Sequence, residues 1–246
     1  MQKICIIIPC YNEEERLNIQ ALKDFMLSHP SVSFLGVNDG SRDKTEALLN
    51  ALHVEFGHQF KALNLAKNSG KAEAVRQGML FALKENEFDY VGYWDADFST
   101  PLDEIDHFMA FCGGTLSHSI VMGSRIARLG SQVQRKMMRH YLGRIFSTLT
   151  SRILKLRVYD TQCGAKLIAA NEIENLFKIP FVSKWFFDVE LLARFIVKHG
   201  REQTYKQVME VPLTKWIEVG GSKLKAFDFL KVPLELFKIR RHYKLG

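Results

Sequence analysis

The sequence has no long apolar run and little cysteine. No apolar segment approaches the ~18 residues that a membrane-spanning helix needs, and the amino-terminal segment MQKICIIIPCYNEEE reaches three acidic residues too early for a signal peptide. The 4 cysteines include no CxxC pair, and none has a histidine at zinc-finger spacing. We therefore expect a protein that stays inside the cell with its thiols reduced.

Two common phosphate-binding signatures are also missing. No GxGxxG follows the first apolar segment and no GxxxxGK[ST] occurs anywhere, which argues against dinucleotide-dependent redox chemistry and P-loop ATP hydrolysis. The composition, 47% apolar and 25% charged residues, is that of a globular enzyme and excludes a disordered or fibrous protein. A length of 246 residues predicts a single domain over residues 1–246.

Charge is distributed unevenly along the chain. Residues 1–123 carry 10 Lys/Arg and 17 Asp/Glu, a net charge of −7, whereas residues 124–246 carry 24 and 10, a net charge of +14. A positive surface on the second half attracts phosphate as nucleic acid, anionic lipid or a phosphorylated substrate. The net charge alone does not distinguish among these three kinds of ligand.

Short apolar runs alternate with amphipathic stretches through the first half. Strands are expected at residues 3–9, 32–38, 60–65, 89–97 and 119–124, and helices between Asn12 and His29, at 43–56 and at 71–86. This alternation predicts an α/β protein whose mostly parallel central sheet is flanked by helices.

The second half contains two basic amphipathic segments. In 137–156, Tyr141, Ile145, Leu149 and Ile153 share one face with arginines among the polar positions, and 225–246 mixes aromatic with basic residues. The stretches 132–157 and 225–244 are typical of segments that dock on an anionic membrane. For residues 137–156, packing on the sheet is expected as strongly as docking on a membrane. For residues 225–244, we expect contact with a membrane or with a second copy in a homodimer.

Polar residues follow the first, second and fourth expected strands, where ligands bind in open α/β sheets. Asp95 and Asp97 stand at i and i+2, a spacing that lets two carboxylates turn toward one Mg²⁺ or Mn²⁺ ion. A solvated turn is the alternative for this pair. Asp39 and its neighbours likewise fit either a ligand site or a turn in which Gly40 adopts positive φ.

Taken together, these segments resemble one family. The segments IIIPCYNEEERL, VNDGSRDKT, NSGKAEAVRQGM and YWDADFSTP resemble the nucleotide-sugar half of the family-2 inverting glycosyltransferases, which have the GT-A fold. The segments GSRIA, YDTQCGAKLI, WFFDVELLAR and EVPLTKWIEVGGSKL resemble the polyprenyl-phosphate glycosyltransferases, first the dolichyl-phosphate glucosyltransferases and next the mannose synthases. The resemblance covers residues 3–230 and implies a nucleotide-sugar-binding half, 1–124, and an acceptor-binding half, 125–246.

The resemblance also implies roles for single residues. It places five of them around the nucleotide, namely Pro9, Tyr11, Glu13, Asp39 and Lys71. It assigns Asp95 and Asp97 to the metal on the diphosphate, with the ribose as a second role for Asp95. Ala72, Ser99 and Ala165 depart from the family pattern. Ser99 stands where mannose synthases often have a further metal contact, which weakens a mannosyl interpretation a little and leaves fewer protein groups to bind the metal. The transmembrane segments that flank many relatives are missing from the sequence.

The acceptor decides whether the reaction needs a general base. A phosphate monoester carries a charge of about −1.5 to −2 and attacks unaided, but it needs cations beside it, for which the candidates are Arg125, Arg135, Arg139 and Lys223. A sugar hydroxyl needs a carboxylate base, for which Asp160 and Asp188 are candidates. A structural role for Asp160, orienting Arg125 or capping a turn, is as well supported as the role of base. For Asp188, capping of a helix is the favoured role. Cys163 is expected to pack, not to act as a nucleophile.

The expected activity is inverting transfer of a hexose from a nucleotide-diphosphate sugar to a polyprenyl phosphate, with Asp97, Arg125 and Asp160 as catalytic residues. UDP-glucose is the favoured donor and GDP-mannose the alternative. The expected location is cytoplasmic, on the inner face of the membrane. A family-2 transferase with a saccharide hydroxyl acceptor is the second hypothesis. A phosphate-binding module is the third, although base-stacking and helix-turn-helix signals for nucleic acid are absent.

Overall fold

The computed structural model describes residues 2–85, 87–113, 117–134, 137–219 and 232–246, without the side chains of residues 134 and 137–140. The elements in chain order are β1 (Ile4–Cys10), α1 (Ile19–Ser28), β2 (Val32–Asn38), α2 (Thr45–Glu55), β3 (Phe60–Asn64), α3 (Lys71–Glu85), β4 (Tyr90–Trp94), α4 (Glu104–Met109), β5 (Ile120–Ser124), β6 (Gln132–Gln134), α5 (Met137–Leu154), β7 (Ala165–Ala169), α6 (Ala170–Phe177), α7 (Phe187–Gln207), β8 (Val208–Pro212), β9 (Lys215–Ile217) and α8 (Val232–His242).

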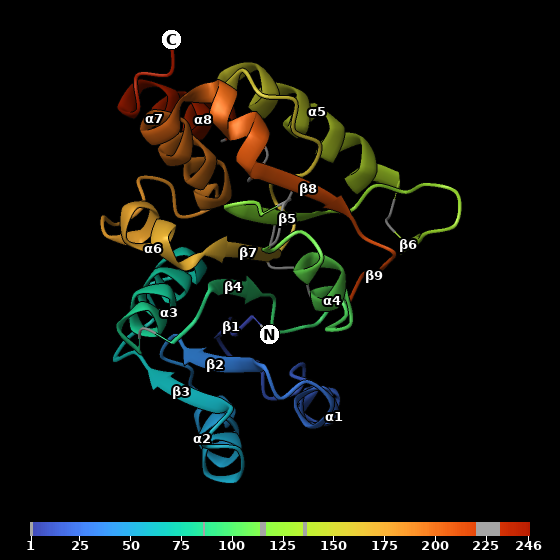
Figure 1. The fold of residues 1–246 in the computed structure, drawn as a ribbon, viewed down its shortest axis with the longest axis vertical. Helices are drawn as coiled ribbons and strands as arrows, with labels where there is room; N and C mark the ends of the chain where they lie inside the picture. The colour runs from blue at the N-terminus through green and yellow to red at the C-terminus, as the bar shows by residue number, and fades with distance from the viewer. Residues whose placement is uncertain (1, 86, 114–116, 135–136, 220–231) are drawn as a thin grey trace.

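Seven strands form the central sheet, in the order β3-β2-β1-β4-β7-β5-β8 (Figure 1). β7 runs antiparallel to both β4 and β5, and the other pairings are parallel. The prediction of a mostly parallel sheet is confirmed. The carboxyl ends of β1, β2, β4, β5 and β8 therefore lie at one edge, and the segment that enters β7 lies there too. β6 and β9 pair as a separate two-stranded sheet.

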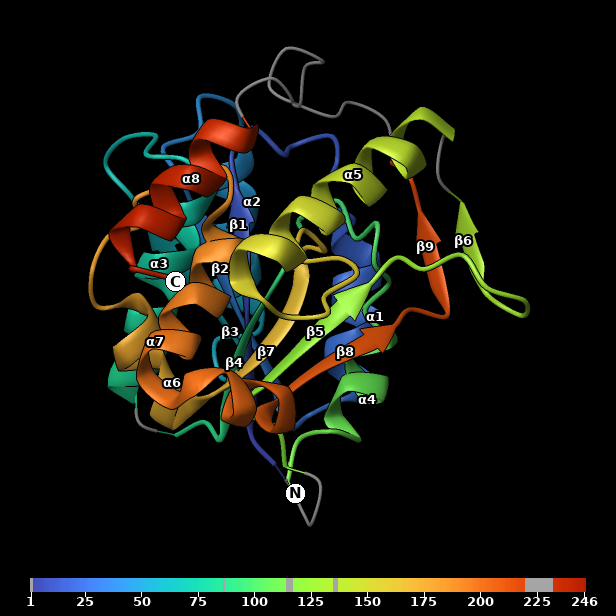
Figure 2. The ribbon, with the colours of Figure 1, turned by 90° about the horizontal axis from the view of Figure 1, so that it is seen from above.

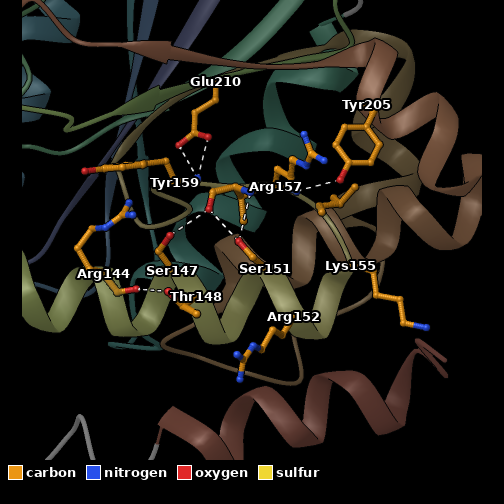
Figure 3. A pocket seen from close by; sticks show the side chains of 12 residues that line it. Arg144, Ser147, Thr148, Ser151, Arg152, Lys155, Arg157, Tyr159, Tyr205 and Glu210 are labelled. Carbon is orange, nitrogen blue, oxygen red and sulfur yellow. Dashed lines mark hydrogen bonds between the residues drawn. The ribbon is translucent and has the colours of Figure 1, made fainter. Parts of the chain in front are cut away.

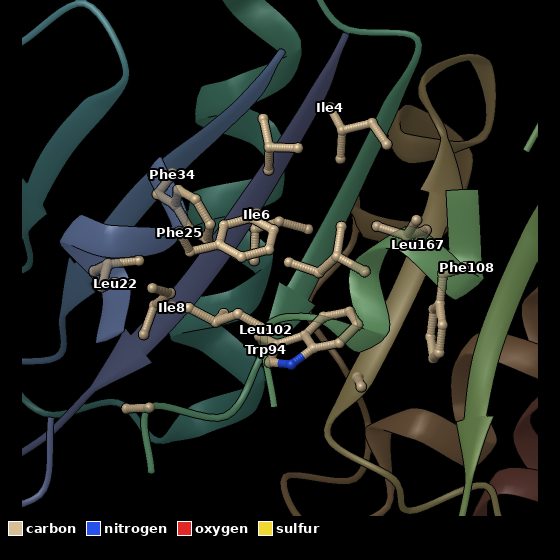
Figure 4. Packing of buried hydrophobic residues seen from close by; sticks show 14 of the residues in the cluster. Ile4, Ile6, Ile8, Leu22, Phe25, Phe34, Trp94, Leu102, Phe108 and Leu167 are labelled. Atoms are coloured by element: carbon tan, nitrogen blue, oxygen red, sulfur yellow. The ribbon is translucent and has the colours of Figure 1, made fainter. Parts of the chain in front are cut away.

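β1 shows why its sequence reads as a continuous apolar run. Side chains alternate across a strand, so Ile4, Ile6 and Ile8 pack on one face with α1 and α4, and Cys5 and Ile7 pack on the other. All five are at most 3% exposed. The first of these faces is seen in Figure 4.

α3 lies close against the second face of the sheet, beside α6 (Figure 1). A Cβ on Gly78 would come within 2.5 Å of the Ile7 side chain and 2.9 Å of the Val37 side chain. Glycine at this position therefore permits the close approach of α3. That approach fixes the amino end of the helix, where Lys71 is the first residue.

α5, α7 and α8 share a third apolar cluster beyond β5 (Figure 2). α5 buries Phe146 and Leu154, with Leu149 and Ile153 partly buried beside them. Tyr141 and Ile145 are each 59% exposed, so the predicted apolar face of this segment is open to solvent at Tyr141 and Ile145 and packs against the core at Leu149 and Ile153. The inward face is set by contacts with α7 and α8, which the periodicity of one segment does not contain.

The first helix begins later than expected. Residues after Asn12 form turns, and α1 starts at Ile19, where Asn18 accepts a hydrogen bond from the Ala21 N–H as the amino-terminal cap. None of the helices within the described residues is long and apolar enough to cross a membrane.

Candidate active site

The loops after β1 and β2 are joined by hydrogen bonds from side chains to backbone. Asn12, at φ 52°, accepts from the Arg42 N–H at 2.9 Å, and its own N–H donates to Ser41 Oγ at 3.1 Å. The Glu13 N–H donates to Thr45 Oγ1 at 2.8 Å. The predicted nucleotide residues Pro9, Tyr11 and Glu13 lie at or just after the carboxyl end of β1, on a rim that these bonds join to the loop after β2, and Glu13 is buried.

Asp39 connects this rim to α3. It is 2% exposed, and its two carboxylate oxygens accept the Ser69 and Gly70 N–H groups, each at 2.8 Å. Gly40 has φ 65°, and a Cβ there would lie 2.7 Å from the backbone of the 67–68 segment, so the tight turn requires glycine. Asp39 thus fixes the loop that leads into Lys71. Its direct contact with a nucleotide stays a prediction.

Asp95 and Asp97 follow β4 directly and each has a cationic partner. Asp97 Oδ2 accepts from Arg16 Nη2 at 2.8 Å, and Asp97 Oδ1 accepts the Ser99 N–H at 3.0 Å. Asp95 Oδ1 pairs with Lys71 Nζ. The two carboxylates therefore lie at the predicted edge, with their charges balanced by basic side chains from the rim and from α3.

The carboxylates of Asp95 and Asp97 can be compared with the ligands that a divalent metal ion requires. Among the described residues no group of three or more His, Cys, Asp and Glu side chains surrounds a common point. Mg²⁺ is commonly bound by one or two carboxylates together with substrate phosphates. The Asp95 side chain is 40% exposed and the Asp97 side chain 19%. The residues thus fit an ion bound together with a diphosphate, and do not fit an ion held by the protein alone.

Lys71 keeps its positive charge although it is partly buried. Burial lowers its pKa, but the negative charges of Asp95 and Asp188 outweigh this, so that the pKa lies above its ordinary value. Lys71 therefore places a permanent positive charge beside Asp95 at neutral pH. Its side chain is 41% exposed and remains accessible to an anionic ligand.

The segment that enters β7 contacts Asp95. The Asp95 N–H donates to the Gly164 carbonyl at 2.9 Å, and a Cβ on Gly164 would overlap the Asp95 carboxylate. Asp160, in the same segment, accepts from Arg125 Nε at 2.7 Å and Arg125 Nη2 at 2.8 Å. The Arg125 guanidinium also lies 5.5 Å from the centre of the Trp216 ring.

In this geometry the Asp160 carboxylate is engaged by Arg125. Both of its oxygens bind the Arg125 side chain, and Oδ2 also accepts the Arg125 N–H. Burial lowers the pKa of Arg125, but the charge and hydrogen bonds of Asp160 together with other nearby negative groups outweigh burial, so the pKa lies above its ordinary value. Of the two roles expected for Asp160, the structure favours orientation of Arg125 over proton abstraction. Arg135, Lys223 and the side chain of Arg139 lie outside the described residues.

Asp188 does not cap its helix, so that prediction is wrong. α7 has Phe186 at its amino-terminal cap, and Asp188 instead accepts from Lys166 Nζ at 2.6 Å and from the Tyr93 hydroxyl. Lys166 also donates to the carbonyls of Thr161 and Cys163, at 2.9 and 2.7 Å. This buried cluster holds the segment that carries Asp160.

Cys163 packs as predicted. Its side chain is fully buried, and burial raises the pKa of the thiol to about 11. A thiol with this pKa is neutral near pH 7 and is a poor nucleophile.

Two residues of the site escaped the sequence analysis. Arg16, the partner of Asp97, lies in a run of charged residues and carries no spacing signal. Glu210, in β8, accepts the N–H groups of Tyr159 and Asp160, with its shortest bonds at 2.9 and 2.6 Å. Burial raises the pKa of Glu210. A carboxylate inside the apolar strand VMEVP was the available signal for a structural acid.

Comparison with known proteins defines the class. Residues 5–177, from β1 through α6, match the model of the family described as Glycosyl transferase family 2. The chain belongs to glycosyltransferase family 2 and is a glycosyltransferase. It is 30% identical over 253 residues to a dolichyl-phosphate beta-glucosyltransferase of Trichomonas vaginalis, covering 98% of this chain and 71% of the relative.

Further relatives carry the same name. The dolichyl-phosphate beta-glucosyltransferase of Saccharomyces cerevisiae is 29% identical, with 99% of this chain and 75% of the relative covered. The human one is 28% identical, with 100% and 77% covered.

Solved structures confirm the fold. A glucosyl-3-phosphoglycerate synthase from Mycobacterium tuberculosis, in complex with Mn²⁺, UDP-glucose and phosphoglyceric acid, aligns with a TM-score of 0.69 over 100% of this chain and 81% of its own. The identity is 14%, so the likeness concerns the fold alone. The prediction of a GT-A fold is confirmed.

Proposed function

We propose that this glycosyltransferase moves glucose from UDP-glucose to a polyprenyl phosphate of the dolichyl type, with inversion and with a divalent cation. The names of the relatives support the donor sugar and the acceptor. The observation that carries the proposal is the place of Asp95 between the two halves. It pairs with Lys71 on the donor side and lies against Gly164 in the segment that positions Arg125.

On the donor side, the chain supplies charge where a diphosphate would leave. Asp95 and Asp97 are the residues that would hold Mg²⁺ or Mn²⁺. When bound, such an ion supplies positive charge to the departing diphosphate. Lys71 adds a fixed positive charge beside Asp95. Arg16, bound to Asp97 at 2.8 Å, adds a second one that can turn to the phosphates.

On the acceptor side, the carboxylates favour a phosphate over a hydroxyl nucleophile. A hydroxyl needs a general base, but Asp160 is engaged by Arg125, and Asp188 is engaged by Lys166 and Tyr93. A phosphate needs cations and hydrogen-bond donors instead. Beside Asp160, Thr161 Oγ1 and Gln162 Nε2 are buried without a partner among the described residues, and both can donate to a phosphate oxygen.

The membrane is the source of such an acceptor. We place the chain at the inner, cytoplasmic face as a peripheral protein. Large apolar side chains are exposed on two adjacent helices, at Tyr141 and Ile145 on α5 and at Leu234 and Phe237 on α8. Aromatic and aliphatic groups beside basic ones suit a lipid surface. A homodimer stays a prediction.

An acceptor panel tests this proposal. Purified protein receives radiolabelled UDP-glucose and Mn²⁺ with a polyprenyl phosphate, the matching polyprenol, a free saccharide or 3-phosphoglycerate, and a parallel series uses GDP-mannose. We expect label in the lipid phase only with UDP-glucose and polyprenyl phosphate, in the β configuration. Product on a saccharide would establish the hydroxyl-acceptor alternative instead. Product on 3-phosphoglycerate alone would also overturn the proposal.

A further inference from the structure

A second, basic pocket lies away from the Asp95 site. It is an open hollow of ≈ 610 Å³ between the carboxyl-terminal half of α5, the segment 155–159, α7 and β8 (Figure 3). Four cationic side chains line it, namely Arg144, Arg152, Lys155 and Arg157. The proposed transfer makes no use of any of them.

The charge of this pocket is unbalanced. All four cationic residues are exposed, and none forms an ion pair with a carboxylate of the described residues. Glu210 is the one acidic residue of the lining, and its oxygens accept the backbone N–H groups of Tyr159 and Asp160. The pocket therefore presents an excess of positive charge to solvent, and its one carboxylate is engaged by the backbone.

Hydrogen bonds join the walls of the pocket to one another. Ser147 Oγ and Ser151 Oγ both donate to the Val158 carbonyl, at 3.0 and 2.9 Å, and tie the 155–159 segment to α5. The Arg144 guanidinium lies 4.3 Å from the centre of the Tyr159 ring, which holds one cation at the rim. In Figure 3 the cationic side chains stand on different sides of Ser151.

The pocket also offers a hydroxyl donor. Tyr205 Oη accepts the Arg157 N–H at 3.0 Å, and its own hydrogen has no acceptor within the described part of the chain. A hydroxyl donor among several cations is suited to the oxygens of a phosphate group.

The end of a helix does not account for this cluster. Cations are favoured in the last turn of a helix, which explains Arg152 and Lys155. Arg144 lies more than two turns before the end of α5, however, and Arg157 lies beyond it. Their position around one hollow therefore needs a second explanation.

The neighbouring surface indicates where the ligand would come from. Tyr141, Ile145, Thr148 and Arg152 are exposed at successive i, i+3 or i+4 positions and form one stripe along α5. The stripe begins with the apolar side chains of Tyr141 and Ile145 and ends with the basic side chain of Arg152. A helix of this kind lies on an anionic lipid surface, with its basic residues at the level of the headgroups.

We propose that this basic pocket is a phosphate-binding site separate from the transfer site, occupied by a phosphate group presented by a lipid headgroup or by a small soluble ligand. Arg152 and Arg157 supply the charge, and Tyr205 donates a hydrogen bond. The exposed apolar residues of α5 favour the lipid as the source. The site does not depend on which sugar is transferred.

The test compares two variants of equal charge. Arg152→Gln/Arg157→Gln removes two cations of the pocket, and Lys3→Gln/Lys84→Gln removes two exposed cations of the first half. One arm measures co-sedimentation with phosphatidylcholine vesicles that contain phosphatidic acid, and the other measures calorimetric titration with glycerol 3-phosphate. Each cation near a lipid surface contributes about fivefold, so we expect binding about thirtyfold weaker in the pocket variant alone.

Each outcome decides the proposal. Loss in the vesicle arm alone supports a headgroup, and loss in both arms supports a phosphate site that also takes a soluble ligand. No binding by wild type in either arm, or equal loss in both variants, overturns the site. Transfer to a detergent-dispersed polyprenyl phosphate should be unchanged in the pocket variant. A failure of the proposed transfer is therefore seen separately from a failure of this site.

Discussion

At the scale of single residues, the site depends on how closely Gly164 approaches Asp95. The Asp95 N–H binds the Gly164 carbonyl, and there is no room for a Cβ between the two residues. The Asp95 carboxylate therefore touches the backbone of the segment that carries Asp160.

We expect Gly164→Ala to raise the KM for UDP-glucose at least about tenfold, because the methyl group must displace the Asp95 carboxylate and small displacements at such sites are costly. Steady-state kinetics measure the effect, with circular dichroism as the check on folding. Gly246→Ala is the control, because a Cβ there meets nothing within 4 Å. Unchanged donor kinetics in Gly164→Ala would refute the placement of Asp95.

The Arg125–Asp160 pair permits a second test. If Asp160 orients Arg125, Asp160→Asn raises the KM for polyprenyl phosphate about tenfold, since a charge-assisted bidentate contact is lost, and leaves the KM for UDP-glucose unchanged. If Asp160 is a general base, kcat itself falls by about 10²–10⁴ with little change in KM. Arg125→Lys should resemble the first pattern, because lysine keeps the charge but not the planar fork.

At the scale of elements, β7 explains why residues far apart in the sequence meet. It runs against its neighbours, so its amino end lies beside the carboxyl ends of β4 and β5. The segment 160–164 is thereby placed between Asp95 and Arg125. Lys166, the second residue of β7, holds this segment through two carbonyls and Asp188.

Removing one partner of this buried pair should cost more than changing both. Lys166→Met leaves the Asp188 carboxylate buried without its cation, and we expect the free energy of unfolding to fall by about 3–5 kcal/mol. In Lys166→Met/Asp188→Asn the asparagine is neutral and still accepts from Tyr93, so at least half of the loss should be recovered. Urea unfolding measures both. Equal losses in the two variants would show that the charge is not the cause.

Much of the fold was predictable from the sequence because hydrophobic periodicity is a local property. The strands β1 to β5, the helices α2 and α3, and the position of Asp95 and Asp97 at a strand end all follow from it. The pairings across the site were not predictable in the same way. Arg16 reaches Asp97 across 81 positions, and Asp188 finds Lys166 instead of its own helix end. Such contacts depend on strand order and register.

At the scale of the whole molecule, buried thiols link stability to pH. Burial raises the pKa of Cys5 and Cys112 to about 12 and that of Cys163 to about 11, from 9.0. A raised folded pKa means that stability is complete below pH 9 and falls as pH rises toward 11 to 12, because only the unfolded chain ionises there.

We expect the three thiols together to lower the free energy of unfolding by about 4 kcal/mol between pH 8 and pH 10. Urea unfolding under reducing conditions at the two pH values measures this. Cys112→Ala should show a drop smaller by about one third. A pH-independent free energy in wild type would contradict the burial of these thiols.

The divalent cation at Asp95 and Asp97 is central to the proposed reaction, and the structure predicts that the protein alone holds it poorly. Electron paramagnetic resonance of Mn²⁺ tests this directly, with wild type and Asp97→Asn, each with and without UDP. We predict weak Mn²⁺ binding to wild type alone, binding at least about tenfold tighter with UDP, and no such gain in Asp97→Asn. If UDP does not change Mn²⁺ binding to wild type, or if Asp97→Asn shows the same gain, the account of this site is contradicted.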